Sequence, residues 1–129
     1  MIPLDQTIFT VPGGNCFAAC VASLLEVSLS RVPNFHNEED WATALAAWLL
    51  PRGMYPVYVG LQGGKDAWRP QGLYILGGQS PRGAWGHAVL AKGNVIVHDP
   101  HASRDGVTTW DEATLIVKLD PGPERHLEK

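Results

Sequence analysis

Residues 13–26 have the sequence GGNCFAACVASLLE, which predicts the helix around which the rest of the chain is arranged. The two glycines permit a tight turn and Asn15 is a favourable N-cap, so we expect the helix to run from about Cys16 to Glu26. Its larger apolar residues recur at helical spacing, and its alanines let other elements approach closely. We therefore predict a central, mostly buried helix with Cys16 in its first turn.

The chain after this helix predicts a second helix and then a series of strands. The second helix is expected to start after its N-cap Asn37, with acidic residues 38–40 in the first turn, and its periodicity places Trp41 and Trp48 in the core. Strands are predicted at residues 55–60, 72–76, 87–91, 95–99 and 114–119, with a short turn at 29–31 and a loop at 61–71. Helices followed by an antiparallel sheet make an α+β fold.

The strands on either side of residues 92–94 are predicted to form a hairpin with a three-residue turn. Counted outward from that turn, Val89 would face Val97. His87 would face Asp99, and directly opposed residues have Cβ atoms about 4.5–5.5 Å apart. The imidazole and the carboxylate would then be neighbours. The apolar residues of the same face, which are Val89, Ala91, Val95 and Val97, would form a floor against the first helix.

Length and composition indicate one domain and exclude some classes of partner. A chain of 129 residues with a hydrophobic fraction of 45% suits a single packed domain, expected at residues 1–119, with 120–129 as a flexible tail. The net charge is −3 and the ten Lys and Arg are scattered, so neither nucleic acid nor an anionic membrane is expected as a partner. No signal sequence or membrane span is recognisable, and we expect a cytoplasmic protein.

Cys16, His87 and Asp99 are the residue types of a nucleophilic triad. The unpaired N–H groups at a helix N-terminus stabilise a thiolate, and the same groups can bind a developing oxyanion. His87 would deprotonate Cys16 or hold it as an ion pair, and Asp99 would orient the imidazole. Gln6 lies upstream, where its side-chain amide could be a second oxyanion donor beside the N–H of Cys16.

Three sequence blocks resemble the papain-like cysteine peptidase superfamily, and within it the bacteriocin-leader peptidases and their relatives. They are Gly14-Asn15-Cys16-Phe17-Ala18-Ala19-Cys20, Gly86-His87-Ala88-Val89-Leu90 and Val97-His98-Asp99-Pro100. In that group a Gln precedes a Cys at a helix start, Gly-His begins a strand, and Asp-Pro follows one hairpin later. The first block also looks like small uncharacterised proteins of bacteriophages. Phe17 stands where the leader peptidases usually have Gly, and Gln6 lies farther upstream of the Cys than is usual.

The resemblance implies a papain-like fold, in which N-terminal helices pack on an antiparallel sheet and the central helix carries the Cys. It implies a cysteine peptidase or amidase that forms a covalent acyl-enzyme with a peptide or protein substrate, for which a host bacterial protein is one candidate. Acyl transfer and deamidation would use the same residues, and neither a cofactor nor a metal is implied. A non-catalytic binding module with this fold is the alternative.

Neighbours of the triad are expected to line a cleft. Asn15 and Gly86 adjoin Cys16 and His87 in the sequence. Trp85 lies two residues before His87, so it either walls the cleft or packs in the core. Trp68, in the glycine-rich loop, is a candidate lid or substrate contact.

Cys20 and two further histidines allow another interpretation. Cys20 is expected in the core, one helical turn below Cys16, although it could resolve an oxidised Cys16. A metal or redox module would use both cysteines together with His98 and His101. However, two cysteines separated by three residues within a helix do not match zinc-site spacing.

Overall fold

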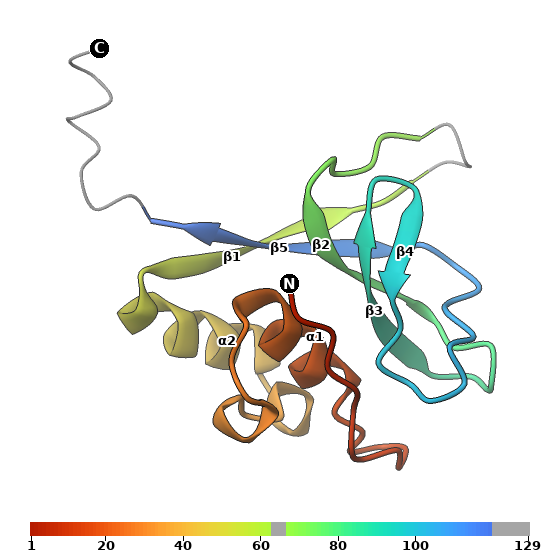
Figure 1. Cartoon of the computed structure of the whole chain (residues 1–129), viewed down its shortest axis with the longest axis horizontal. Coiled ribbons are helices and arrows are strands. Elements are labelled where there is room, and N and C mark those ends of the chain that lie inside the picture. The colour runs from red at the N-terminus through yellow and green to blue at the C-terminus, as the bar shows by residue number, and fades with distance from the viewer. Residues whose placement is uncertain (63–66, 120–129) are drawn as a thin grey trace.

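Residues 1–62 and 67–119 are described by a computed structural model, and they form a fold of helices and an antiparallel sheet (Figure 1). In this part of the chain the helical elements are α1 (Cys16–Leu25), η1 (Leu29–Arg31), η2 (Phe35–Asn37), α2 (Trp41–Leu49) and η3 (Leu50–Arg52). The strands are β1 (Met54–Gly60), β2 (Leu73–Gln79), β3 (Gly86–Lys92), β4 (Val95–His98) and β5 (Glu112–Lys118). The α+β prediction is confirmed, and the predicted tail at 120–129 lies outside the described residues.

The sheet has the strand order β1-β5-β2-β3-β4, and each neighbouring pair is antiparallel. Strand β5 lies between β1 and β2, which places Glu112 opposite Gly77. The sheet is strongly curled, so that β3 and β4 stand across the direction of β1 and β5 in Figure 1. Gly86, which begins β3, pairs with Gln79 at the end of β2. This end of the sheet carries His87.

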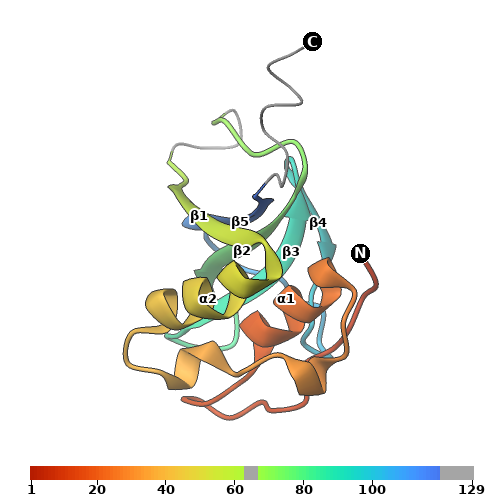
Figure 2. The ribbon, with the colours of Figure 1, turned by 90° about the vertical axis from the view of Figure 1, so that its left-hand side faces the viewer.

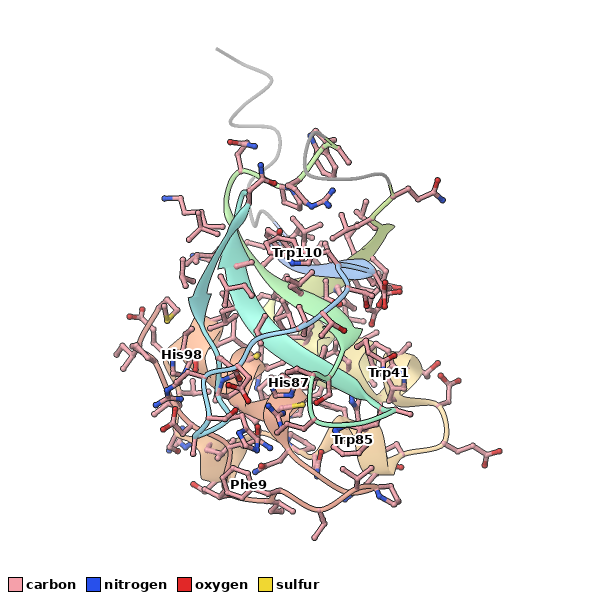
Figure 3. All side chains as sticks on the ribbon, turned by 90° about the vertical axis from the view of Figure 1, so that its right-hand side faces the viewer. Phe9, Trp41, Trp85, His87, His98 and Trp110 are labelled. Carbon is pink, nitrogen blue, oxygen red and sulfur yellow. The ribbon has the colours of Figure 1, made fainter. Side chains whose placement is uncertain are left out.

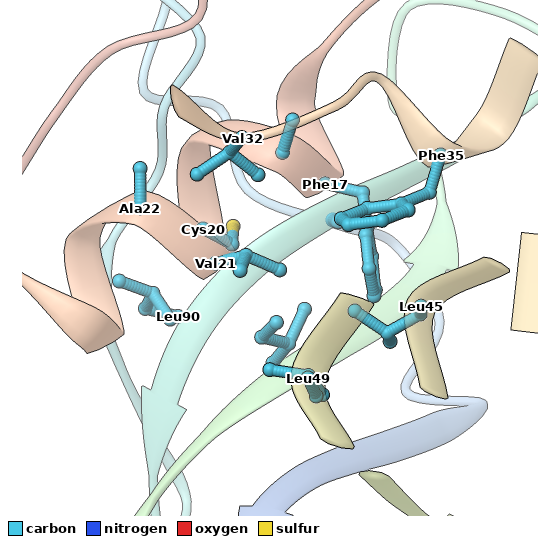
Figure 4. Close-up of a cluster of buried hydrophobic side chains, with 12 residues drawn as sticks. Phe17, Cys20, Val21, Ala22, Val32, Phe35, Leu45, Leu49 and Leu90 are labelled. Atoms are coloured by element: carbon cyan, nitrogen blue, oxygen red, sulfur yellow. The ribbon is translucent and has the colours of Figure 1, made fainter. Parts of the chain in front are cut away.

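The helices cover one face of the sheet, with α1 against β3 and β2 and with α2 against β1 (Figure 2). Residues 17–23 of α1 are all buried, which confirms the prediction of a central helix. The apolar cluster between helices and sheet includes Phe17, Val21, Phe35, Leu45, Leu49 and Leu90 (Figure 4). A second cluster, on the opposite face, contains Leu61, Tyr74, Leu76, Val89, Ala91 and Ala113. Packing on both faces fixes the start of β3 relative to the start of α1.

Helix α2 begins later than the sequence predicts. Asn37 belongs to the preceding turn η2 instead of capping the helix, and Glu38 and Glu39 also precede α2. The N-cap is Asp40, which accepts hydrogen bonds from Thr43 N at 3.3 Å and from Thr43 Oγ1 at 2.8 Å. Two donors on one carboxylate explain why the helix starts there.

Within residues 1–62 and 67–119, no single helix is long and apolar enough to cross a membrane.

The hairpin of β3 and β4 differs in register from the prediction. Lys92 pairs with Val95 across a two-residue turn, where a three-residue turn was expected, and a bulge beside Leu90 shifts the rest of the ladder. The turn is held by a contact distant in sequence, because Gly93 O accepts a hydrogen bond from the Tyr74 hydroxyl at 2.7 Å. Local turn chemistry therefore did not decide the register.

The apolar floor predicted against the first helix is also wrong. Val89 packs in the cluster on the far face of the sheet, and Val97 is 40% exposed. Leu90 faces α1 instead. Ala91 shares the far face with Val89, and Val95 is exposed. Alternate residues of a strand point to opposite faces of the sheet, and in β3 it is Ala88 and Leu90, not Val89 and Ala91, that face the helices.

Strand β2 continues past its predicted end at Leu76 and includes Gly77 and Gly78. Adjacent glycines are typical of turns, but here both pair with neighbouring strands. Gly78 has no room for a side chain, because an added Cβ would lie 1.8 Å from Thr109 O. Gly77 has that room, since an added Cβ would meet only Glu112 O, at 3.8 Å.

Candidate active site

The start of α1 is shaped by the side chain of Asn15. Asn15 occupies the N-cap position without capping the helix. Its Oδ1 accepts hydrogen bonds from Thr7 N at 3.0 Å and Ile8 N at 2.9 Å, and its Nδ2 donates to Thr7 Oγ1 at 3.0 Å. The N–H groups of the first turn, beginning with that of Cys16, therefore have no side-chain cap and can bind an anion at the helix end.

His87 and Asp99 form a buried pair. His87 Nε2 lies 2.7 Å from Asp99 Oδ1, and each side chain is only 3% exposed. Asp99 also accepts hydrogen bonds from the main-chain N–H of His101, at 2.9 Å, and of Gly106, at 2.7 Å. Three donors fix the orientation of this carboxylate. The prediction that these two side chains meet is confirmed, although through a different strand register.

Cys16 contacts the other side of the imidazole. Cys16 and His87 line the same two cavities, and because Nε2 faces Asp99, the ring nitrogen left for Cys16 is Nδ1. Burial alone would lower the pKa of His87, but hydrogen bonds to Asp99 and Cys16 and the charges of both groups raise it from 6.5 to about 9. Burial would raise the pKa of Asp99, but hydrogen bonds from His87 and two main-chain N–H groups lower it below 3.8. At pH 7 the pair is an imidazolium and a carboxylate.

Arg104 ties the loop after Asp99 to the N-terminal segment. Its guanidinium binds both carboxylate oxygens of Asp5, at 2.6 and 2.9 Å, and also donates to the main-chain oxygen of Asp99. Gln6 follows Asp5 in the sequence, and its main-chain N–H donates to Pro100 O at 3.0 Å. Gln6 is therefore held beside the loop that carries Asp99, although the two are distant in sequence.

Gln6 is buried near Cys16. Its Nε2 donates to Ile8 O at 2.9 Å, which uses one of the two protons of that amide. Its Oε1 is buried and has no hydrogen-bond partner among the described residues. Gln6 and Cys16 line the same cavity. The geometry leaves one amide proton of Gln6 for a ligand there, and the oxyanion role stays a prediction.

Two cavities meet at Cys16 and His87. The first, of about 260 Å³, lies against the N-terminal loop and is lined by residues 9–14, Gln6, His36, Arg82, Trp85, Gly86 and His101. The second, of about 290 Å³, lies between the helices and the sheet and is lined by Phe17, His36, Trp41, Ile75, Gly77, Gly78, Gly86, Ala88, Glu112 and Thr114. Figure 3 looks onto this face, with His87 near the centre, Trp41 and Trp85 to one side and Phe9 below. A ligand could therefore extend from the candidate nucleophile in two directions.

The predicted cleft residues fall into two groups. Trp85 and Gly86 line the first cavity, and Trp85 is 37% exposed there. Asn15 lines neither cavity that contains Cys16, because it is buried and its side chain is bonded to Thr7 and Ile8.

Trp68 lies away from both cavities and is 64% exposed. Its loop leads into Leu73, which pairs with Lys92 at the end of β3. His87 is at the start of β3, so the length of the strand separates it from this loop. Trp68 is therefore neither a lid nor a contact of the described site.

Several lining residues were not predicted from the sequence. Phe17, His36 and Trp41 form an aromatic group, with ring centroids 4.6 Å apart for Phe17–His36 and 4.7 Å for His36–Trp41. Burial lowers the pKa of His36, so this ring is neutral at pH 7. Helical periodicity predicted Trp41 on the inner side of α2. Trp41 is the first residue of α2 and lies beside η2, and this position brings its side chain to the second cavity. No pattern in the sequence indicated that Glu112 lines the site.

Cys20 is fully buried in the core, as predicted. Burial raises the pKa of its thiol well above 9.0, and the charges of Cys16 and Asp99 act in the same direction.

Within residues 1–62 and 67–119, no three His, Cys, Asp or Glu side chains form a group that could hold a metal ion. His98 bonds instead to Leu4 O, at 2.9 Å.

Comparisons of the chain with protein-family models, with curated proteins and with solved structures found no match. A functional assignment therefore rests on the geometry of this site.

Proposed function

We propose that the protein is a papain-like cysteine hydrolase in which Cys16 is the nucleophile, His87 the acid and base, and Asp99 the orienting carboxylate. The observation that carries the proposal is that Cys16, at the open end of α1, shares both cavities with His87, which is bonded to buried Asp99. Cys16 lies in α1, His87 in β3 and Asp99 directly after β4, and the two cavities join at Cys16 and His87.

The charge state of the pair supports a thiolate mechanism. His87 is protonated at pH 7, because its pKa is raised to about 9 by Asp99 and Cys16 against the effect of burial. A neighbouring imidazolium and the positive end of a helix both stabilise a thiolate. Cys16 would therefore act as one half of an ion pair with His87, ready to attack without a separate deprotonation step.

The proposed reaction is acyl transfer to Cys16 and then to water. Cys16 Sγ bonds to the substrate carbonyl carbon, and the resulting oxyanion is bound by the N–H of Cys16 and the free amide proton of Gln6. His87 donates its proton to the leaving amine as the C–N bond breaks. Water then attacks the thioester, His87 accepts a proton from it, and the C–S bond breaks to release the acid and restore the thiolate. An amine as the second nucleophile would make the same site an acyl transferase.

The test is the alkylation rate of each cysteine with iodoacetamide across a pH series, followed by peptide mass spectrometry. Near pH 6 we expect Cys16 of the wild type to react on the order of 100-fold faster than Cys16 of His87→Ala, because an ordinary thiol with a pKa of about 8.5 is almost fully protonated there. Cys20 should stay unreactive in the folded protein, since it is fully buried.

His98→Ala is the matched control, because it removes a histidine that bonds to Leu4 O and Asp5 and not to Cys16. Its Cys16 should react as in the wild type. Reaction of Cys16 only above pH 8, or equal rates with and without His87, would overturn the catalytic proposal and leave the non-catalytic binding module.

A further inference from the structure

We infer that the second cavity binds a substrate side chain with an apolar stem and a cationic end, a lysine or an arginine, and that Glu112 selects it. This inference rests on the proposed function, because it assigns a substrate residue to the same site. The cavity begins at Cys16 and His87, so a side chain bound in it belongs to a residue near the bond that is attacked.

The floor of this cavity is the helix-facing side of the sheet. In β2 the side chain of Ile75 packs in the cluster beneath the helices, whereas Leu76 packs on the far face, so Gly77 faces the helices again. In β5, Ala113 packs on the far face, so Glu112 also faces the helices. Gly77 and Glu112 are directly paired. Glu112 therefore lies on the cavity floor, in β5, beside Gly77 of β2.

Gly77 keeps the cavity open. Its φ is not in the left-handed region, and an added Cβ would make only an ordinary contact of 3.8 Å, so neither the backbone nor close packing requires glycine. Gly78, in contrast, is required by the backbone of Thr109. A glycine inside a strand weakens it and often marks the close approach of a ligand. We attribute Gly77 to the space that a ligand needs.

The walls and the charge of the cavity favour an amphipathic cation. Phe17 and Trp41 form an apolar wall opposite the floor, and their ring centroids are 5.3 Å apart. Glu112 is exposed and forms no ion pair with another residue in the described part of the chain. Lysine and arginine bury their methylene stems on apolar surface and keep the charged group at the rim. The face of Trp41 is a further favourable site for a cation.

Apart from His87, whose positive charge faces the carboxylate of Asp99, the other charges around the cavity do not oppose this choice. His36 is neutral at pH 7, because burial lowers its pKa. Tyr58 packs on Trp41 at 5.6 Å, and burial raises the pKa of Tyr58, with Glu112 and Asp40 adding to the effect. Glu112 lines the cavity, and Asp40 precedes Trp41 directly as the N-cap of α2. The cation Arg82 lines the other cavity and forms an ion pair with Asp105.

The experiment measures peptide binding by Cys16→Ala, which cannot form a covalent product. Amide chemical shifts are recorded while acetyl-Gly-Lys-Gly-amide, or the same peptide with norleucine, is added. We expect the lysine peptide to bind roughly fivefold more tightly, the preference that one partly exposed ion pair provides. The largest shifts should fall on Ile75, Gly77 and Glu112.

Three variants in the Cys16→Ala background sharpen the result. Glu112→Gln should abolish the preference for lysine, whereas Glu39→Gln, which removes an exposed carboxylate outside the cavity lining, should retain it. Gly77→Val should weaken binding of both peptides, because its side chain would occupy the cavity. Thermal melts of all three variants establish that the fold is retained.

Equal affinities, shifts located elsewhere, or no shifts up to the solubility limit of the peptides would overturn the inference. Because binding needs no reactive thiol, it is independent of the alkylation test. Rapid alkylation of Cys16 that depends on His87, combined with no lysine preference, would overturn the inference alone. A lysine preference with an unreactive Cys16 would overturn the hydrolase and retain the cavity.

Discussion

His98 and Asp99 are consecutive residues, and each takes part in a histidine–aspartate contact. Asp99 meets His87 at 2.7 Å with both side chains 3% exposed, whereas His98 lies 3.2 Å from Asp5, whose side chain is 49% exposed. Asp99 accepts two main-chain hydrogen bonds in addition. Asp5 instead binds the exposed guanidinium of Arg104. The two contacts use the same residue types, but the carboxylate is half exposed in one and buried in the other.

Burial and anchoring, rather than residue type, decide how strongly the two members of a histidine–aspartate contact depend on each other. In water the attraction between an imidazolium and a carboxylate is screened, so an exposed pair contributes little to stability. A buried charge without its partner is costly, so each member of the buried pair depends on the other. We therefore expect the two pairs to respond very differently to the same substitutions.

The largest expected effect is on stability. Asp99→Ala should lower the free energy of unfolding by about 3–5 kcal/mol, because it leaves an unpaired His87 and two unpaired main-chain donors in a buried site. Asp5→Ala should lower it by at most about 1 kcal/mol, since its partners remain in contact with water. Urea denaturation followed by circular dichroism measures both. Equal losses for the two variants would mean that burial does not distinguish the pairs.

The sequence predicted the members of the buried pair but not how they meet. The helix start, the Gly-His pair and the Asp-Pro pair are local signals, and each lies where its motif placed it. The hairpin register depended on the contact of Tyr74 with Gly93 and on a bulge, neither of which has a signal within the hairpin. The contact of His87 with Asp99 was therefore predicted correctly from an incorrect register.

The cavity residues show the same limit of local signals. Asn15 has the right residue type for an N-cap, but donors from the N-terminal segment, far outside the helix, take its side chain. Glu112 reaches the site only because β5 inserts between β1 and β2, a pairing that no local pattern encodes. Trp68 was placed near the site because the strand order, and hence the end of the sheet its loop occupies, was not known.

A smaller effect is expected on the pH dependence of stability. The folded pKa of His87 is about 9 against 6.5 for an ordinary histidine, so the folded protein binds the proton more tightly than the unfolded chain. The resulting stabilisation is fully present below pH 6.5 and is lost as the pH rises through about 9. The shift corresponds to a loss on the order of 3 kcal/mol. Part of this shift comes from Cys16, and a Cys16 thiolate would release a proton on folding that offsets the proton His87 binds. The measurement is therefore made on Cys16→Ser, whose denaturation midpoints between pH 6 and 10 should show a smaller decline.

Two further substitutions in Cys16→Ser separate the contributions to this pH dependence. Addition of His87→Gln should remove most of the decline, and addition of His98→Gln should retain it. Stability of Cys16→Ser that is constant from pH 6 to 9 would show that Asp99 does not raise the pKa of His87 in the folded protein.

The smallest expected effect concerns a second pair of like residues, Asn15 and Asn34. The Asn15 side chain makes three hydrogen bonds to residues 7 and 8, whereas the Asn34 side chain donates one, to Gly13 O at 3.0 Å. Asn15→Ala should lower the free energy of unfolding by about 2 kcal/mol and Asn34→Ala by about 1 kcal/mol. Urea denaturation at pH 7 gives both values. Equal losses would mean that the segment of residues 7 and 8 is held by other contacts.

Asn15→Asp separates the structural role of this residue from its effect on the helix end. The aspartate keeps the oxygen that accepts from Thr7 N and Ile8 N, and Thr7 Oγ1 can donate to its second oxygen, so stability should stay within about 1 kcal/mol of the wild type. The added negative charge, one residue before Cys16, opposes a thiolate at the same helix end. Alkylation of Cys16 near pH 6 should therefore slow while the fold is retained. An unchanged alkylation rate would show that the field at the start of α1 does not act on Cys16, and that His87 alone controls its reactivity.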